Sequence, residues 1–335
     1  MTRISARYLA KRVVVSYLTL LVIMSLLFVL IRSMPGSFIQ SMITPDLDPA
    51  DIQRLRETWG LNEPLWQQYV DFMTNYQTGN FGRSPTEKEP VWDIIARRFP
   101  RTLVLFGAIF ISGYIIGPIM GMYLGWWRGT TRDKAIFSGS LLAYSMPVFW
   151  ISWLFIWAFN YKLGWLPSSF MFTKFPTEVY GPGFEWTAVT LITDLLKHLA
   201  LPLISTVFVG WVGSMLIMRP SMNNVTSEDY VFLAQAKGLS ERTVMMKHAA
   251  RNALIPVATQ AIVGLAFLLD GSVIIENVFS WPGLGDVIVG AVLSRDYPIT
   301  QAAFFMLAVL IIVMRLVTDI VYTYLDPRIK FGGDS

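Results

Sequence analysis

Four charged side chains interrupt the long apolar runs of this sequence, and their chemistry suits contact with an ion or a polar solute. They are Asp270, Glu276, Arg315 and Asp319. An ionised group among apolar ones is costly, so such residues usually face a polar path or an opposite charge. Arg315 and Asp319 are four residues apart and share one helix face, which favours a structural pair.

Asp270 has no opposite charge in its own apolar run, so three roles stay open for it: lining a polar path, pairing with Arg315, or other burial. Helical residues rise about 1.5 Å each. Measured from the inner side of the membrane, Asp270 lies roughly 21 Å from the start of its run, and Arg315 lies roughly 15 Å from the end of its own. A long arginine side chain could bridge the difference. We therefore expect an ion pair of Arg315 with either Asp270 or Asp319 beside the path.

Motifs for catalysis and for nucleotide binding are missing from the sequence. It has no Gly-rich phosphate loop, no His-Glu-x-x-His zinc motif and no Gly-x-Ser-x-Gly nucleophile motif. It has no Cys, and its two His, His198 and His248, are far apart, which argues against a thiolate or clustered-His metal site. We therefore expect no catalytic residues, no metal site and no cofactor, and an intramembrane enzyme has no motif in its favour.

The elements that must position these charges are apolar runs long enough to cross a membrane. The chain has 335 residues, of which 54% are hydrophobic and only 15% charged, and its mean hydropathy is +0.49. A spanning helix needs roughly 20 mostly apolar residues. The sequence thus predicts an all-α integral membrane protein with six transmembrane helices, over residues 13–31, 102–127, 136–159, 198–218, 256–278 and 300–324.

The orientation in the membrane follows from the positions of Lys and Arg, which favour cytoplasmic loops. Basic residues gather before the first run, at 128–134, at 219–251 and at 328–330. Most competing ones lie in the long segment 33–101, and long loops cross the membrane largely regardless of charge. We expect both termini in the cytoplasm, and the net charge of +4 then needs no nucleic-acid partner.

These spans divide the chain into three parts. Residues 1–32 form a cytoplasmic N-terminus and the first helix, kept as an anchor; 33–101 form an external segment; and 102–335 form a five-helix core. The core contains a polar cytoplasmic loop at 228–255. In that loop Ser227 is predicted to cap one helix, Gly238 to break it, and Ser240 to cap a second helix that ends near Ala253, before Pro256 opens the fifth span.

Several patterns predict packing rather than chemistry. Small residues four apart let helices approach closely in lipid, either within the chain or against a second membrane subunit; here they are Gly113, Gly117, Gly121 and Gly125. A Met stripe, Met215, Met218 and Met222, and an amphipathic segment with Val91, Ile94, Ile95 and Phe99 on one face also predict packing. Trp150, Trp153 and Trp157 suit anchoring at the interface better than stacking on a solute.

The polar loop also carries motifs that identify a family. Asp229-Tyr230-Val231, Ala236-Lys237-Gly238-Leu239-Ser240-Glu241-Arg242 and Arg251-Asn252-Ala253-Leu254-Ile255-Pro256 resemble the cytoplasmic loop of binding-protein-dependent ABC transporter permeases of the dipeptide/oligopeptide/nickel class. Further motifs in the family's order include Gly79-Asn80-Phe81-Gly82-Arg83-Ser84, Phe279-Ser280-Trp281-Pro282-Gly283-Leu284-Gly285 and Arg295-Asp296-Tyr297-Pro298. The set resembles the first of the two permeases in such systems.

The resemblance implies a subunit of an ATP-driven importer in the plasma or inner membrane of a prokaryote. Its partners would be a second, similar permease, two cytoplasmic ATPase subunits that bind the ATP, and an external solute-binding protein. The solute would be a peptide or a related molecule such as an oligosaccharide. The loop would provide a coupling helix that contacts the ATPase through Ala236, Lys237, Gly238, Leu239, Ser240 and Glu241.

The sequence departs from this family at a few positions. Phe232, Leu233 and Gln235 stand where basic or small polar residues are usual, Asp270 where a small residue is usual, and Arg315 where Asn is usual. An alternative function is a stand-alone channel or ion-coupled carrier that uses Asp270 and Glu276. Transport by this chain without ATPase partners would distinguish that alternative.

Overall fold

The computed structural model describes residues 6–33, 53, 62–180, 184–266 and 272–325. Every regular element in that part of the chain is a helix, and one antiparallel bridge joins Arg83 to Pro90. The chain divides into two compact units. One comprises Met1–Thr102 with Pro282–Ser335, and the other is Leu103–Trp281.

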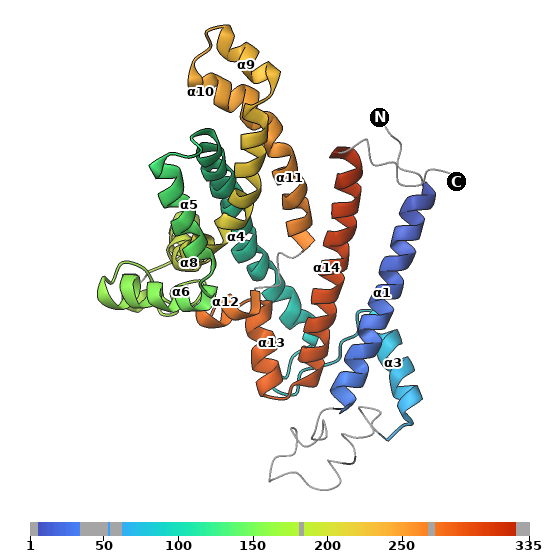
Figure 1. Ribbon diagram of the computed structural model, residues 1–335. Helices are drawn as coiled ribbons and strands as arrows, with labels where there is room; N and C mark the ends of the chain where they lie inside the picture. The colour runs from blue at the N-terminus through green and yellow to red at the C-terminus, as the bar shows by residue number, and fades with distance from the viewer. Residues whose placement is uncertain (1–5, 34–52, 54–61, 181–183, 267–271, 326–335) are drawn as a thin grey trace. The chain divides into compact units, whose positions relative to one another are not determined.

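The first unit is built around two long helices that lie side by side, α1 (Ala6–Ser33) and α14 (Tyr297–Leu325) (Figure 1). Against them pack α3 (Leu65–Gln77), α13 (Leu284–Leu293) and the first turns of α4 (Val91–Trp126). Its core holds Met24, Phe28, Phe72, Tyr76, Phe81, Val91, Ile94, Ile95, Leu284, Ile288 and Phe305. The predicted apolar face is therefore confirmed, with Val91, Ile94 and Ile95 buried and Phe99 partly buried against the same core.

A buried carboxylate, Asp296, braces the short segment before α4 against the start of α14. Its Oδ2 accepts hydrogen bonds from Ser84 Oγ at 2.5 Å and from the Thr86 backbone N–H at 3.3 Å. Its Oδ1 accepts one from the Ile299 backbone N–H at 3.2 Å. Two motifs far apart in sequence, 79–84 and 295–298, thus meet at one buried acid.

The second unit contains the rest of α4 and most of the other helices. The chain continues through α5 (Thr131–Tyr144), α6 (Val148–Phe155), a π-helical stretch η1 (Ile156–Lys162), α7 (Pro176–Tyr180) and the long α8 (Ala188–Thr226). It then forms α9 (Asp229–Ala236), α10 (Glu241–Thr243), a second π-helical stretch η2 (Val244–Ala249), α11 (Ala250–Ala266) and α12 (Ser272–Val278).

The predicted glycine and methionine stripes pack against each other, α4 on α8. A Cβ at Gly121 would lie 2.7 Å from Met218 Cβ, and one at Gly125 would lie 2.6 Å from Met222 Cβ. Met215, Met218 and Met222 are almost completely buried. At three of the four positions, Gly117, Gly121 and Gly125, the glycine stripe therefore serves packing within the chain, one of its two predicted roles. A Cβ at Gly113 would meet nothing within 4 Å.

Four described helices are long and apolar enough to cross a membrane, at Ala10–Ser33, Val91–Trp126, Ala188–Thr226 and Tyr297–Asp319. They match the predicted spans 13–31, 102–127, 198–218 and 300–324. The amphipathic segment before residue 102 and the second predicted span form one continuous helix, α4. The predicted span 256–278 lies partly outside the described residues.

The third predicted span, 136–159, is not one straight helix. Its two halves, Thr131–Tyr144 and Val148–Lys162, meet at an angle of 99°, and a fifth span results only if they are counted together. The break falls at Met146 and Pro147. Proline disfavours helical geometry at the residue before it and has no N–H to donate, so α5 ends and α6 begins anew with Pro147 as its N-cap.

Candidate functional site

The predicted polar loop folds as a helical knob, residues 229–249, at the end of α8. Its first helix, α9, begins after Glu228, whose side chain makes no capping hydrogen bond. The predicted cap, Ser227, instead ends α8, since its backbone N–H donates to the Asn224 carbonyl. The prediction for Ser227 was wrong because α8 continues through Thr226, one residue before it.

The break in the middle of the knob lies where the sequence predicts it. Gly238 has φ of +74°, in the left-handed region where glycine carries no Cβ penalty. Ser240 then caps α10, with its Oγ accepting from the Thr243 backbone N–H at 3.4 Å and lying 2.8 Å from the Thr243 hydroxyl. The helix, glycine, helix arrangement is thus present.

The second helix of the knob runs farther than predicted. From Glu241 the chain stays helical through α10, η2 and α11 to Ala266, with Pro256 inside the helix rather than at the start of a new one. The turn at 244–249 is π-helical, a feature frequent at functional sites. The knob is therefore joined directly to a long helix, and its movement would carry α11 with it.

The inner face of the knob is packed and its outer face is open. Val231, Ala234, Val244, Met245 and Ala249 are buried together with Met122, Met218 and Met222 of α4 and α8. All six residues at 236–241 are exposed, and so are the apolar side chains of Phe232 (72%), Leu233 (55%) and Met246 (47%). The knob is thus a rigid projection with an exposed, partly apolar surface, a shape suited to docking.

A carboxylate of the knob holds the end of α4. Glu241 Oε1 accepts hydrogen bonds from the indole Nε1–H of Trp126 at 2.7 Å and from that of Trp127 at 3.3 Å. Trp127 also stacks on Tyr123, one turn earlier in α4. The knob is therefore bonded to the turn between α4 and α5.

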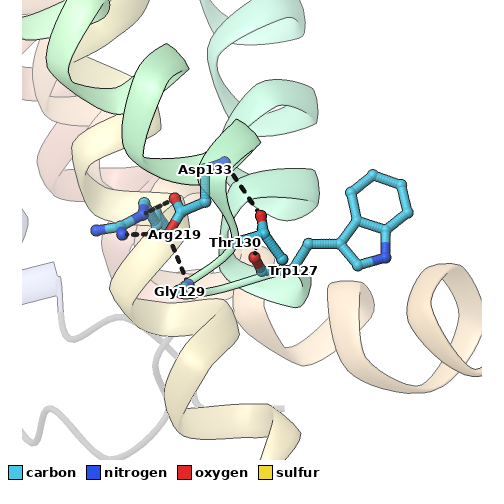
Figure 2. Close-up of polar contacts among 5 residues, drawn as sticks. All are labelled: Trp127, Gly129, Thr130, Asp133 and Arg219. Atoms are coloured by element: carbon cyan, nitrogen blue, oxygen red, sulfur yellow. Dashed lines mark hydrogen bonds and ion pairs between the residues drawn. The ribbon is translucent and has the colours of Figure 1, made fainter.

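The same turn is held from its other side by a buried ion pair, shown in Figure 2. Arg219 of α8 donates from Nε to Asp133 Oδ1 at 3.0 Å and from Nη2 to Oδ2 at 2.9 Å. The Gly129 backbone N–H donates to the same Oδ2 at 2.9 Å, and Thr130 accepts from the Asp133 N–H. Asp133 is only 1% exposed, so α5 is fixed firmly to α8.

The four predicted intramembrane charges do not form one cluster among the described residues. Asp319 pairs with Arg12 of α1 at 3.0 Å, and Arg315 is exposed. The predicted Arg315–Asp319 pair is not found within the described part of the chain. Asp270 lies outside the described residues, while Glu276 is buried in α12. In the described residues, no group of three or more His, Asp or Glu could hold a metal ion.

Sequence reasoning missed the residues around the turn between α4 and α5. One signal was available, because Thr130 and Asp133 have the spacing of a capping box at the start of a helix. Nothing local marks Arg219 as the partner of Asp133, or Trp126 and Trp127 as donors to Glu241, since more than 80 residues separate each pair. Those contacts depend on the tertiary fold.

Comparisons with known proteins identify the family to which this chain is similar. Residues 113–331 match the family described as binding-protein-dependent transport system inner membrane component, and residues 5–106 match its N-terminal family. The di/tripeptide transport system permease protein DppB of Pseudomonas aeruginosa (strain UCBPP-PA14) is 35% identical over 96% of this chain and 98% of its own length. The glutathione transport system permease protein GsiC of Escherichia coli (strain K12) is 33% identical over 97% and 99%.

Proposed function

The chain belongs to the binding-protein-dependent transport system inner membrane components, and from that premise we propose that it is the first permease of an ATP-driven importer of small peptides. As a member of this family it is a non-catalytic, multi-pass subunit of the inner membrane. The observation that carries the proposed mechanism is the knob, with its exposed surface at 236–241 and its opposite face packed on α4 and α8.

Di- and tripeptides, including glutathione, are the proposed solutes. The named relatives, 33–35% identical over nearly their whole length, belong to di/tripeptide and glutathione systems. The expectation of an oligosaccharide has no such support, and we do not carry it forward. An external binding protein would deliver the peptide, so the choice among peptides would depend mainly on that partner.

The proposed complex contains this chain, a second similar permease, two ATPase subunits and the binding protein. The knob would dock on an ATPase subunit through Ala236, Lys237, Gly238, Leu239, Ser240 and Glu241. Closure of the ATPase pair on ATP would then push the knob, and the packed inner face would pass the movement to α4 and α8. ATP and peptide would thereby act on one equilibrium between inward-facing and outward-facing states.

Reconstitution tests the importer against the channel or carrier. With all partners in proteoliposomes, labelled tripeptide should enter only when ATP and the binding protein are both present. Proteoliposomes that contain this chain alone should show no uptake. Uptake by the chain alone, in the absence of ATP, would contradict the proposal and favour the alternative based on Asp270 and Glu276.

Two glycines provide a matched test of the knob itself. Gly238 and Gly164 both have positive φ, +74° and +64°, and a Cβ at either position would meet nothing within 4 Å. Alanine should therefore strain both backbones by a similar amount, on the order of 1 kcal/mol. Only Gly238→Ala should lower peptide-stimulated ATP hydrolysis, by several-fold, because only that turn belongs to the knob. Equal losses in both variants would count against docking at 236–241.

A further inference from the structure

We propose that Trp126, Trp127, Asp133, Arg219 and Glu241 form a clamp on the turn between α4 and α5, which makes this turn move with the knob. We call these five residues the turn clamp. The proposal rests on the importer function proposed above and assigns them positioning roles, without contact with peptide or nucleotide.

The first attachment joins the knob to the end of α4. Both indole N–H groups reach the same oxygen of Glu241, at 2.7 Å from Trp126 and 3.3 Å from Trp127. Charge-assisted hydrogen bonds are roughly twice as strong as neutral ones. Glu241 is exposed and belongs to the surface expected to dock on the ATPase, yet this oxygen faces the protein's own turn. It therefore links the docking surface to α4.

The second attachment joins the same turn to α8. The fork of Arg219 meets both oxygens of Asp133, and Arg219 Cζ lies 4.1 Å from the centre of the Phe137 ring. The Gly129 N–H also donates a hydrogen bond to Asp133 Oδ2, and the Thr130 hydroxyl donates to the Trp127 carbonyl at 2.9 Å. Bidentate pairs of this kind fix orientation as well as distance.

The two attachments enclose the turn of only a few residues that joins α4 to α5. A short turn bonded on both sides cannot yield while the knob moves, so displacement of the knob reaches α4 and α5 together. Energetic coupling across a protein travels through such packed and hydrogen-bonded contacts. If the Glu241 attachment is lost, the knob can still dock, but part of its movement is absorbed before it reaches α4 and α5.

Replacing the indole donors tests the first attachment. In the assembled complex, Trp126→Phe with Trp127→Phe should raise the number of ATP molecules hydrolysed per peptide transported at least threefold, while the ATPase subunits still co-purify. The control is Trp153→Phe, a Trp that is 56% exposed in α6 and outside the clamp. A lower thermal midpoint with an unchanged ATP-to-peptide ratio would mean a structural role only and would overturn the proposal.

Substitutions at Glu241 separate the clamp from direct contact with the ATPase. Glu241→Gln loses the charge but keeps an oxygen that can accept both indole hydrogen bonds, so its ATP-to-peptide ratio should lie at least twofold below that of Glu241→Met. Glu241→Met keeps the length but removes the acceptor, and it should match the double Trp variant. Equal damage from Gln and Met, with loss of the ATPase subunits, would show that the charge binds the ATPase and would overturn the clamp.

A distance measurement tests the clamp without any transport. The chain has no Cys, so spin labels can be placed at Leu239→Cys and Arg132→Cys, two exposed positions on the knob and beside the turn. In lipid vesicles the label-to-label distance distribution should be narrow, and it should broaden in the double Trp variant. An unchanged distribution overturns the clamp, whereas a wild-type complex without peptide-stimulated ATP hydrolysis contradicts only the proposed function.

Discussion

At the scale of single residues, the contact between α4 and α8 depends on glycines, because the helices approach too closely there for a side chain to fit. At Gly121 an added Cβ would lie 2.7 Å from Met218 Cβ and 2.9 Å from the Met215 carbonyl oxygen. Backbone cannot shift there without separating the helices. The sequence spacing predicted the close approach, and the structure identifies the partner helix.

We expect Gly121→Ala to destabilise the protein by about 1–3 kcal/mol, the usual cost of overpacking a well-filled site. Gly113→Ala is the control, because it has the same place in the glycine repeat and nothing lies within 4 Å of its Cβ. That variant should be neutral or slightly stabilising, since alanine is the better helix former by about 1 kcal/mol. Thermal unfolding in detergent, followed by circular dichroism, measures both. Equal melting temperatures for the two variants would argue against the tight α4–α8 contact.

The Asp133–Arg219 pair should show strong coupling between its two residues. Removal of one partner of a buried pair leaves an uncompensated charge, which destabilises the protein by about 3–5 kcal/mol. Arg219 is 21% exposed, so we expect Asp133→Asn to cost about 3 kcal/mol, the lower end of that range. The double variant with Arg219→Met should recover part of this loss, because no lone charge remains. Additive losses in a double-mutant cycle of unfolding would contradict the direct pair.

Individual residues differ in how far the sequence predicts their surroundings. Gly238 and Ser240 were predictable because left-handed glycines and serine caps act through neighbouring backbone. Glu241 was predicted as a contact residue from the family resemblance, but its bonds to Trp126 and Trp127 could not be inferred, since they join residues more than 110 positions apart. Pairs of that kind depend on how the helices pack.

At the scale of elements, Ser84 contributes a charged hydrogen bond to the attachment between the segment before α4 and α14. Ser84 donates to the buried Asp296, and its own Oγ accepts from the Glu87 backbone N–H at 2.8 Å. A hydrogen bond to a charged group contributes about 1.5–3 kcal/mol. Ser84→Ala should therefore raise hydrogen exchange of the amides at 84–91 roughly tenfold or more, by easier local opening.

The control for this exchange experiment is Ser294→Ala. Ser294 is exposed, and its hydroxyl bonds to the Gly290 and Ala291 carbonyls of the preceding helix, α13. Its loss should leave exchange at 84–91 unchanged. If Ser84→Ala also leaves these amides protected, other contacts hold the segment and the brace at Asp296 is not needed.

Helix existence was predictable from the apolar runs, whereas helix ends and bends were not. The runs at 13–31, 102–127, 198–218 and 300–324 match long helices because their length and apolarity leave few other structures. The bend of 99° in the third run and the continuation of the knob helix through Pro256 escaped prediction. Proline breaks one helix at Pro147 and is tolerated within another at Pro256, and local sequence does not distinguish these cases.

At the scale of the whole molecule, the distribution of positive charge predicts which ends of the helices lie in the cytoplasm. The knob carries Lys237, Arg242 and Lys247, and Arg128 and Arg132 lie at the turn that it contacts. The positive-inside rule places such loops on the cytoplasmic side, where the proposed ATPase subunits are. Docking on the ATPase requires the knob to lie on the cytoplasmic side of the membrane, and the charge distribution predicts that same side.

Two lysines separated by α8 offer a direct test of this orientation. Lys174 precedes the helix and Lys237 follows it, both are exposed, and the chain has no Cys of its own. In cells whose inner membrane is intact and whose outer membrane has been permeabilised, a membrane-impermeant maleimide should label Lys174→Cys at once. Lys237→Cys should react only after the membrane is broken, because α8 is long enough to place the two positions on opposite sides. Labelling of both from outside would contradict a span at α8, and labelling of Lys237→Cys alone would reverse the orientation and remove the proposed docking site from the cytoplasm.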